Sequence, residues 1–407
     1  MMDADAATDT PRLDAIRRRA LAAAEVAARF ADDVDRNARF PSEAMEVLKQ
    51  QRLLSVLVPA SLDGYEASIS EVATVCRILG RTCASTAMVY AMHQLVVASL
   101  VAHASQSKWH LALLRRVAEE QLLFASATTE GGVGGDIRRS ICGLEYQDGR
   151  FILAKNAPVI SYGEYADAIL VTARRTSTSA PSDQVAVVVT RDSYSLEPLS
   201  NWDTLGMRGT CSRGFQLHAS GAEEQILPGR YGELLAKSGM PLAHVLWGSV
   251  WFGIATDALE RARSFVKSEA KKKPNETSPG AVLLARAIGD LGLINSELET
   301  ALKRYALASE RGSHASGGFA ILMNGLKVNI SQTATSVVGA ALEICGLAGY
   351  RNDSVYSINR HLRDILSAPL MIHNDRILLS TASALLMHPI GDDLFGEWAS
   401  WSESGAT

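Results

Sequence analysis

The stretch from Leu122 to Leu227 has a different pattern from the sequence on either side of it. Its apolar runs are short and rich in β-branched residues, as in AILVTARR and QVAVVVTR, and Gly, Asp, Ser and Pro separate them. Such runs predict β-strands joined by turns. Residues 12–120 and the sequence after Tyr231 instead carry apolar residues at helical spacing. The order of helices, strands and helices predicts an α+β protein with segregated helical and β parts.

Three domains follow from this order. We predict an N-terminal helical domain at residues 1–121, a middle β domain at residues 122–230 and a C-terminal helical bundle domain at residues 231–407. The segment TAMVYAMHQLVVASLVAHA in the first domain is apolar nearly all round, which predicts a central helix. The length of the last helical segments predicts a bundle of four or more members.

Composition limits the class of partner. The chain of 407 residues is 47% hydrophobic and 21% charged, with a net charge of −4, so we expect a globular protein whose main partner is neither nucleic acid nor an anionic membrane. We expect no apolar run to span a membrane, and the N-terminus has no signal-peptide core. The five scattered cysteines include no CxxC pair, which favours reduced thiols. Together these features predict a cytoplasmic protein.

A glycine-rich stretch, SATTEGGVGGDIRRS, follows the first strand-like run. Thr128, Thr129 and Glu130 lead into four glycines and then Asp136. Glycines let the backbone approach a ligand closely and expose its N–H groups. The pattern is neither GxGxxG nor a P-loop. On its own, therefore, the stretch favours a plain β-turn.

A second such stretch, NWDTLGMRGTCSRG, lies between two later strand-like runs. It contains Trp202 and Met207, which are large apolar groups for a strand connection and indicate packing against another part of the molecule. Arg208 has two interpretations here. It contacts a ligand, or it caps carbonyl groups at a structural corner.

Near the C-terminal end, SAPLMIHNDRIL (Ser367 to Leu378) predicts an apolar helix interrupted by His373, Asn374 and Asp375. Polar groups that interrupt a buried helix cost stability unless they are paired or used. This favours a functional role for His373 and Asp375. A polar pair at a subunit interface is the alternative.

The two glycine-rich stretches in a β domain between two helical domains resemble the acyl-CoA dehydrogenase superfamily of flavoproteins. RNARFPSEAMEVLKQQRLLSVLVPASLDGYEAS resembles another element of that family, with Asp63 in place of a glycine. ASTAMVYAMHQ, DGRFILAKNAPVISYG and EICGLAGYRNDSVYSINRHLRD are similar to further elements. The resemblance implies an N-terminal all-α domain, a β-barrel-like middle domain and a C-terminal four-helix bundle. It also implies flavin between the last two domains, and a homotetramer in which Gly346 to Tyr350 complete a neighbour's site.

The resemblance implies two sets of residues and no metal site. The set implied to hold the flavin is Ala127, Thr128, Thr129, Ile160, Ser161, Arg208, Gly346 and Gly349. The set implied to act in catalysis is His93, Ser161, His373 and Asp375.

Two departures from the family pattern bear on the chemistry. Its dehydrogenases abstract a weakly acidic α-proton with a Glu, which is absent from both usual places, RDILSAPLMIHNDRIL and PLAHVLWG. Asp375 is the nearest substitute. The Arg-x-x-Phe-Gly that helps to hold the FAD diphosphate is absent from the equivalent stretch, SFVKSEAKKKPNE.

One branch of the superfamily shares these losses. Its members are two-component monooxygenases, which use oxygen and reduced flavin from a separate reductase. They resemble this chain at His93, Ser161 and His373, and a Ser with two His can bond the flavin region and assist proton transfer. The alternatives are that His93 fits ordinary dehydrogenases equally and that Ser161 bonds its own backbone at a strand end.

Three functions remain open at this point. The first is a monooxygenase that uses reduced flavin, FAD or FMN, on a small organic or carrier-bound metabolite. The second is an acyl-CoA or acyl-carrier-protein dehydrogenase whose base is Asp375 or a His. The third is a non-catalytic scaffold that retains the fold.

Overall fold

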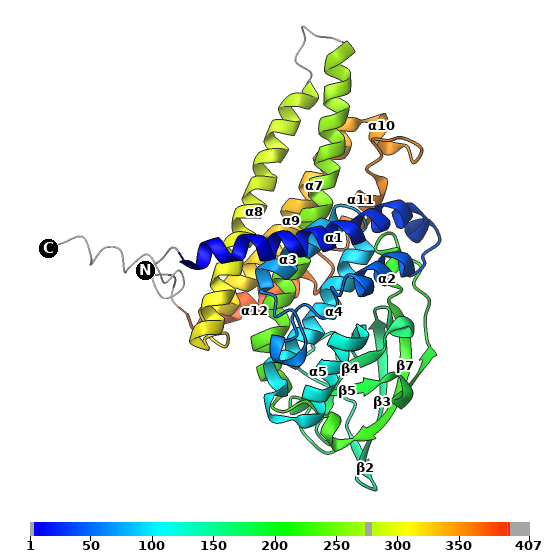
Figure 1. Ribbon diagram of the computed structural model, residues 1–407, viewed down its shortest axis with the longest axis vertical. Helices are drawn as coiled ribbons and strands as arrows, with labels where there is room; N and C mark the ends of the chain where they lie inside the picture. The colour runs from blue at the N-terminus through cyan, green and yellow to red at the C-terminus, as the bar shows by residue number, and fades with distance from the viewer. Residues whose placement is uncertain (1–3, 273–278, 389, 391–407) are drawn as a thin grey trace, which may run out of the picture. The chain divides into compact units, whose positions relative to one another are not determined.

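The computed structural model describes residues 4–272, 279–388 and 390. Its residues form two compact units, Met1–Gly239 and Met240–Thr407 (Figure 1). The predicted helical and β domains, residues 1–121 and 122–230, therefore share one unit. The division from the bundle falls nine residues later than the predicted 230/231, because Tyr231–Leu234 (α6) and the π-helix Leu235–Gly239 group with the first unit.

The helical part of the first unit begins with a long helix that packs on two others. α1 contacts α2 and α3, and α3 contacts α4. α3 begins at a capping box, in which Ser68 Oγ accepts from the Glu71 N–H and Glu71 accepts from the Ser68 N–H. The bounds are α1 (Ala4–Arg36), α2 (Ser42–Gln50), α3 (Ile69–Gly80), α4 (Ala84–His103) and α5 (Lys108–Glu120).

α4 is a core helix. The prediction of a central, all-round apolar helix is confirmed, because its side chains from Ala84 to Leu100 are mostly buried. Ala84–Gln106 and Tyr231–Lys272 are nevertheless long and apolar enough to cross a membrane, so the expectation that no run would reach that length was wrong. Of their most apolar windows, 67% and 83% are buried inside the protein, as in core helices of globular proteins.

Within residues 4–272, the strands form two sheets. One has the order β1-β4-β5, with β1 parallel to β4 and β5 antiparallel to it. The other has the antiparallel order β2-β3-β7-β6, with an irregularity in β3 between Ala157 and Ile160. The bounds are β1 (Phe124–Ala127), β2 (Glu145–Gln147), β3 (Arg150–Ile160), β4 (Ala168–Arg174), β5 (Gln184–Thr190), β6 (Tyr194–Pro198) and β7 (Arg213–Ala222).

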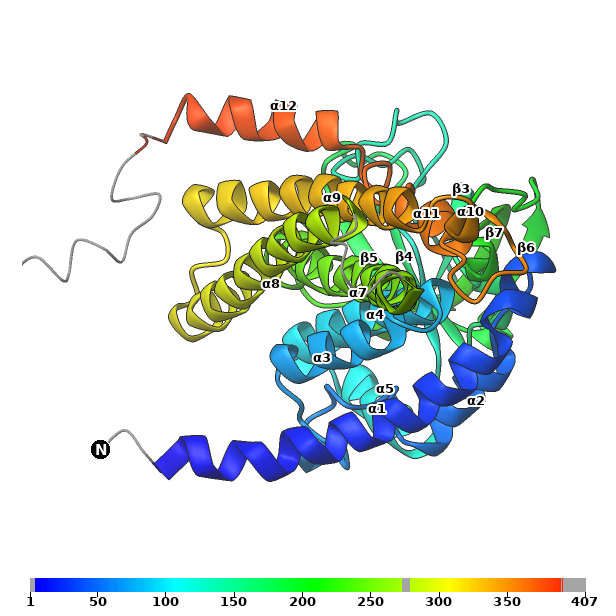
Figure 2. The ribbon, with the colours of Figure 1, turned by 90° about the horizontal axis from the view of Figure 1, so that it is seen from above.

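The second unit is helical, and α9 lies at its centre. α9 contacts α7, α8, α10, α11 and α12, and α7 contacts α8; Figure 2 shows the long helices side by side. The bounds are α7 (Met240–Lys272), α8 (Pro279–Arg311), α9 (Gly317–Cys345), α10 (Leu347–Tyr350), α11 (Asn359–Ile365) and α12 (Asn374–Leu385). Of the stretch SFVKSEAKKKPNE, residues 273–276 lie outside the described residues.

His373, Asn374 and Asp375 do not interrupt a helix. The chain leaves α11 at Ile365, turns through residues 366–373 and enters α12 at Asn374. Pro369 explains the break, because it has no N–H and disfavours helix in the residue before it. The polar residues thus mark a helix start, where an acidic group such as Asp375 is favourable.

Candidate functional site

A row of hydroxyl groups connects the end of β3 to the GMRGT loop. Ser212 Oγ donates to Ser161 Oγ at 2.8 Å, and Ser212 also lies 2.8 Å from Thr210 Oγ1. Thr210 Oγ1 donates to the Met207 carbonyl at 2.8 Å. Ser161 therefore accepts a hydrogen bond from Ser212. The alternative, in which Ser161 bonds its own backbone at the strand end, is not what the structure shows. Among the described residues, none accepts a hydrogen bond from Ser161 Oγ.

The predicted flavin contacts at β1 and β3 lie together. Thr129 Oγ1 donates to the Val159 carbonyl at 3.0 Å, which joins the segment after β1 to the end of β3. Ala127 and Ile160 are fully buried, whereas Thr128, Thr129 and Ser161 are half-buried. The structure thus gathers five predicted residues at one edge, where Thr128, Thr129 and Ser161 are partly exposed.

Both ring nitrogens of His93, a predicted catalytic residue, are bonded to backbone groups of the protein. It is fully buried on α4, and its Nδ1 accepts from the Phe124 N–H at 3.0 Å. Its Nε2 therefore carries the proton and donates to the Leu54 carbonyl at 2.7 Å. Both ring nitrogens are used, so His93 fastens α4 to β1 and to the segment after α2.

This role makes the stability of the protein sensitive to acid. Burial lowers the pKa of His93 to about 4, against the effect of its bond to Leu54. Unfolded histidine titrates near 6.5, so the unfolded chain binds a proton that the folded chain rejects. We expect the melting temperature to fall as the pH drops from about 6.5 towards 4. His93→Gln should make this fall shallower in thermal scans at several pH values. An unchanged pH slope would contradict the assignment.

Arg208 acts as a corner brace, so its predicted contact with flavin is not supported. Its Nε donates to the Asp35 carbonyl at 2.8 Å, and its Nη1 donates to the Thr204 carbonyl at 2.8 Å and pairs with Asp203. The next residue, Gly209, has no room for a side chain, because a Cβ would come within 2.3 Å of Val34. The guanidinium group joins the loop to the end of α1. This agrees with the alternative interpretation, in which Arg208 caps carbonyl groups at a structural corner.

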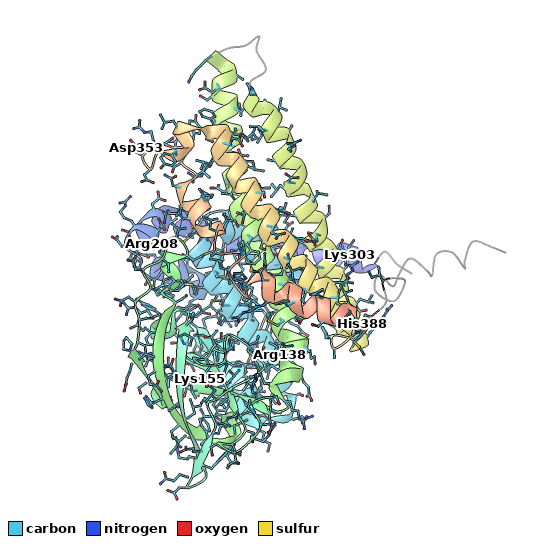
Figure 3. All side chains as sticks on the ribbon, turned by 180° about the vertical axis from the view of Figure 1, so that it is seen from behind. Arg138, Lys155, Arg208, Lys303, Asp353 and His388 are labelled. Atoms are coloured by element: carbon cyan, nitrogen blue, oxygen red, sulfur yellow. The ribbon has the colours of Figure 1, made fainter. Side chains whose placement is uncertain are left out.

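Glu130 closes the glycine-rich loop, a role that the sequence pattern did not reveal. Its buried carboxylate accepts from Ser140 Oγ at 2.6 Å and from the backbone N–H groups of Ile141 and Cys142 at 3.1 and 2.6 Å. Lys155 Nζ of β3, labelled in Figure 3, lies 3.5 Å away. Burial lowers the pKa of Lys155, and the Glu130 charge opposes this. The loop is therefore pinned at both ends rather than being a plain β-turn.

The remaining predicted residues lie in the second unit. His373 Nδ1 and Asp375 Oδ2 are 3.5 Å apart, and both side chains are more than half exposed. Gly346, with φ +54°, ends α9, and Gly349 packs so closely that a Cβ would lie 2.6 Å from that of Cys345. Asn374, next to His373, instead bonds Lys327 and Ser331 in the middle of α9. The pair at His373 and the two glycines are therefore separate features.

This unit contains a second group of polar side chains, which the sequence pattern did not predict. His361 Nε2 lies 2.7 Å from Asp257 Oδ2, and Arg261 Nε lies 2.9 Å from the same oxygen. Burial acts to raise the pKa of Asp257, but its bonds to His361 and Arg261 outweigh this and lower it to about 2. Arg261 also donates to the Ser357 carbonyl at 3.3 Å, so the group fastens α7 to α11 and the turn before it.

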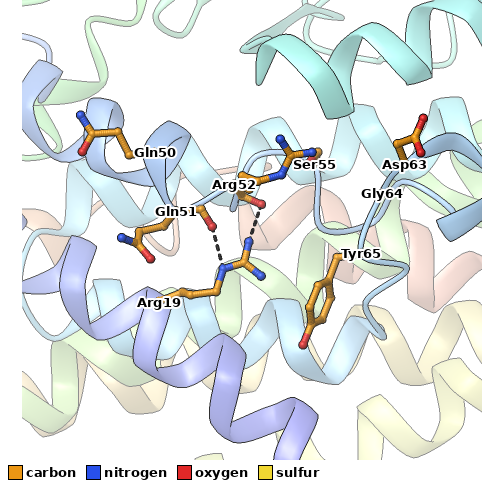
Figure 4. Close-up of a pocket in the computed structure, with 8 residues that line it drawn as sticks. All are labelled: Arg19, Gln50, Gln51, Arg52, Ser55, Asp63, Gly64 and Tyr65. Carbon is orange, nitrogen blue, oxygen red and sulfur yellow. Dashed lines mark hydrogen bonds between the residues drawn. The ribbon is translucent and has the colours of Figure 1, made fainter.

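A pocket of about 380 Å³ lies in the helical part of the first unit (Figure 4). Arg19 donates there to the carbonyls of Gln51 and Arg52 at 2.6 and 2.8 Å, and its guanidinium group lies 5.2 Å from the Tyr65 ring centroid. These bonds connect α1 to the end of α2. None of the predicted site residues lines this pocket.

Comparisons with known proteins identify relatives of this chain. The model of the acyl-CoA dehydrogenase N-terminal domain matches residues 11–121. The chain is 25% identical to a cyclohex-1-ene-1-carbonyl-CoA dehydrogenase of Syntrophus aciditrophicus, over 91% of this chain and 88% of that protein. It is 24% identical to a dibenzothiophene monooxygenase of Mycolicibacterium goodii, over 80% of this chain and 82% of that protein.

A solved structure shows the same fold. The FMN-bound dibenzothiophene monooxygenase TdsC of Paenibacillus sp. A11-2 superimposes with a TM-score of 0.81 at 17% identity, covering 92% of this chain and 98% of that one. The relatives therefore include both dehydrogenases and monooxygenases.

Proposed function

We propose that the chain is a monooxygenase. The proposal starts from the premise that the chain belongs to the acyl-CoA dehydrogenase superfamily and is a flavin-dependent oxidoreductase. It would use oxygen and reduced flavin on a small organic or carrier-bound metabolite. One observation carries this preference. Where the resemblance puts the dehydrogenase base, α12 begins with the exposed pair His373–Asp375, and α7 has no acidic residue in its first turn. An exposed Asp is a weak base for an α-proton.

The edge formed by β1, β3 and the GMRGT loop fits the ring end of a flavin. The Ser161 hydroxyl accepts from Ser212 and keeps its own proton for a ring nitrogen or oxygen. Thr128 and Thr129 are half-buried beside it and offer backbone and hydroxyl groups. When bound in its reduced form, flavin supplies the electrons that activate oxygen. In our proposal Ser161 orients the ring, and the His373 imidazole holds or moves a proton at Nε2 while Nδ1 faces Asp375.

The proposal predicts how flavin is acquired. We expect the purified protein to lose flavin easily and to consume oxygen only when NADH and a flavin reductase supply reduced FMN or FAD. The measurement is an anaerobic spectral titration with NADH plus reductase, and in parallel with acyl-CoA thioesters. Tightly bound yellow FAD that a thioester bleaches would identify a dehydrogenase instead, the function of the Syntrophus relative. Reaction in neither titration would exclude both enzymes. Failure to bind flavin in either redox state would indicate a scaffold.

We further propose a cytoplasmic homotetramer that meets its reductase only transiently. The five cysteines are buried and scattered along the chain without a CxxC pair, which suits a reducing compartment. Large apolar side chains are exposed on α8 and α12, and such surfaces on soluble proteins commonly mark an interface. These side chains are Val282, Ile288, Leu293, Leu378 and Leu379. Light scattering during size-exclusion chromatography measures the oligomeric state.

A further inference from the structure

A buried lysine lies in the middle of α9 without a carboxylate partner. Lys327 is fully buried, and its Nζ donates to Asn374 Oδ1 at 2.6 Å and to the Ile372 carbonyl at 3.1 Å. Among the described residues, no Asp or Glu forms an ion pair with it. Burying an unpaired cation is costly, so the lysine is expected to serve a purpose at this position.

The two acceptors flank His373. Asn374 is itself buried, and its Nδ2 donates to Ser331 Oγ, one helical turn after Lys327, at 3.0 Å. Ile372 has φ +44°, a left-handed conformation that is unfavourable for a β-branched residue. Such a conformation persists only where surrounding contacts hold it. The Lys327 ammonium supplies one of these contacts at the Ile372 carbonyl.

We propose that Lys327 is a positioning residue for His373. It binds the residue before His373 through the backbone and the residue after it through the side chain, and thereby sets the direction in which the imidazole projects. This inference rests on the role given to His373 in the proposed function. Lys327 itself need not contact substrate or flavin.

The charge on Lys327 should make the clamp, and with it the activity, depend on pH. Burial lowers the pKa of Lys327 to about 8. His244 on α7 interacts with Lys327, and burial lowers the pKa of His244 to about 4. His373 and Asp375 flank Asn374, the side-chain partner of Lys327. Trp251 of α7 also faces the ammonium, at 5.8 Å from the ring centroid. A folded-state pKa below the usual lysine value means that the ammonium is lost as the pH rises through about 8, and the clamp weakens there.

The test combines turnover with hydrogen exchange. Lys327→Met keeps the side-chain volume and removes the charge. Ser249→Ala is the matched control, because it removes another buried polar group of this unit that bonds only its own helix, at the Val245 carbonyl. We expect Lys327→Met to lower kcat roughly 10- to 100-fold, to remove the alkaline fall in activity near pH 8 and to speed backbone exchange in residues 367–376. Lys327→Arg should recover part of the kcat.

Each outcome decides the proposal. Turnover, pH profile and exchange in Lys327→Met that match those of Ser249→Ala would overturn it. If Lys327→Met does not fold, Asn374→Ala removes one of the two contacts, and unchanged exchange in residues 367–376 then counts against the clamp. In a His373→Ala background, Lys327→Met should cost no further activity; an equal further loss would show that Lys327 does not act through His373. Faster exchange together with a fully active His373→Ala would retain the clamp and reject the catalytic role of His373.

Discussion

His373→Ala is expected to reduce turnover at least about 100-fold while leaving flavin binding unchanged, since a positioned general acid or base contributes roughly 10²- to 10⁴-fold to a rate. The imidazole is exposed at the start of α12, with Asp375 3.5 Å from its Nδ1. Its removal leaves the buried bonds of Asn374 in place, so the fold should not change. The measurement is kcat with reductase-supplied flavin, together with flavin affinity by fluorescence quenching.

Two further variants make this result specific. His218→Ala removes an exposed histidine on β7 and should keep full activity. Asp375→Asn distinguishes the proposed monooxygenase from a dehydrogenase. A dehydrogenase that uses Asp375 as its base would lose turnover with that variant, whereas the monooxygenase should slow by less than tenfold. Full turnover of His373→Ala would end the role we give it.

Glu130→Gln is expected to lower the free energy of unfolding by about 3 kcal/mol, because it leaves the buried Lys155 cation without its anion. The side chains of Lys155 and Glu130 are 0% and 5% exposed, so water cannot replace the lost partner. The amide also mismatches the bonds from Ser140 and from the N–H groups of Ile141 and Cys142, which close the glycine-rich loop. Urea denaturation followed by circular dichroism measures the change.

The matched control removes both charges. Glu130→Gln with Lys155→Met should recover part of the loss, since a neutral pair no longer buries an isolated cation. Asp136→Asn, at a partly exposed ion pair with Arg138 in the same loop, should cost less than about 1 kcal/mol. A Glu130→Gln variant as stable as the wild type would show that the carboxylate does not hold the loop.

Several strands could be predicted from local pattern alone. The runs AILVTARR and QVAVVVTR correspond to β4 and β5, whose residues are nearly all buried. β2 and β6 were not predicted. All three residues of β2 are exposed, and β6 alternates half-buried and exposed positions, so neither has the apolar run that identifies a strand. The left-handed turn at Asp63, φ +61°, lies where the resembling family has a glycine.

The site was only partly predictable. The resemblance implies that Thr129 and Ser161 both contact flavin, and their segments lie together in the fold; the hydrogen-bond partner of Ser161 is Ser212, 51 positions away. The resemblance implies a catalytic role for His93, yet Leu54 and Phe124 occupy both of its nitrogens. The buried position of Lys327 could not be predicted from the sequence, because a single lysine on a long helix is usually a surface residue.

The sequence by itself determined the order of most helices and strands and the central position of α4, because periodicity and β-branching act over a few residues. Only the tertiary structure decided which polar groups are braces and which are available for chemistry. Arg208 and His93 are engaged by carbonyl and N–H groups, while Ser161 and His373 retain free positions. That distinction depends on partners distant in the chain, which folding brings within hydrogen-bonding distance.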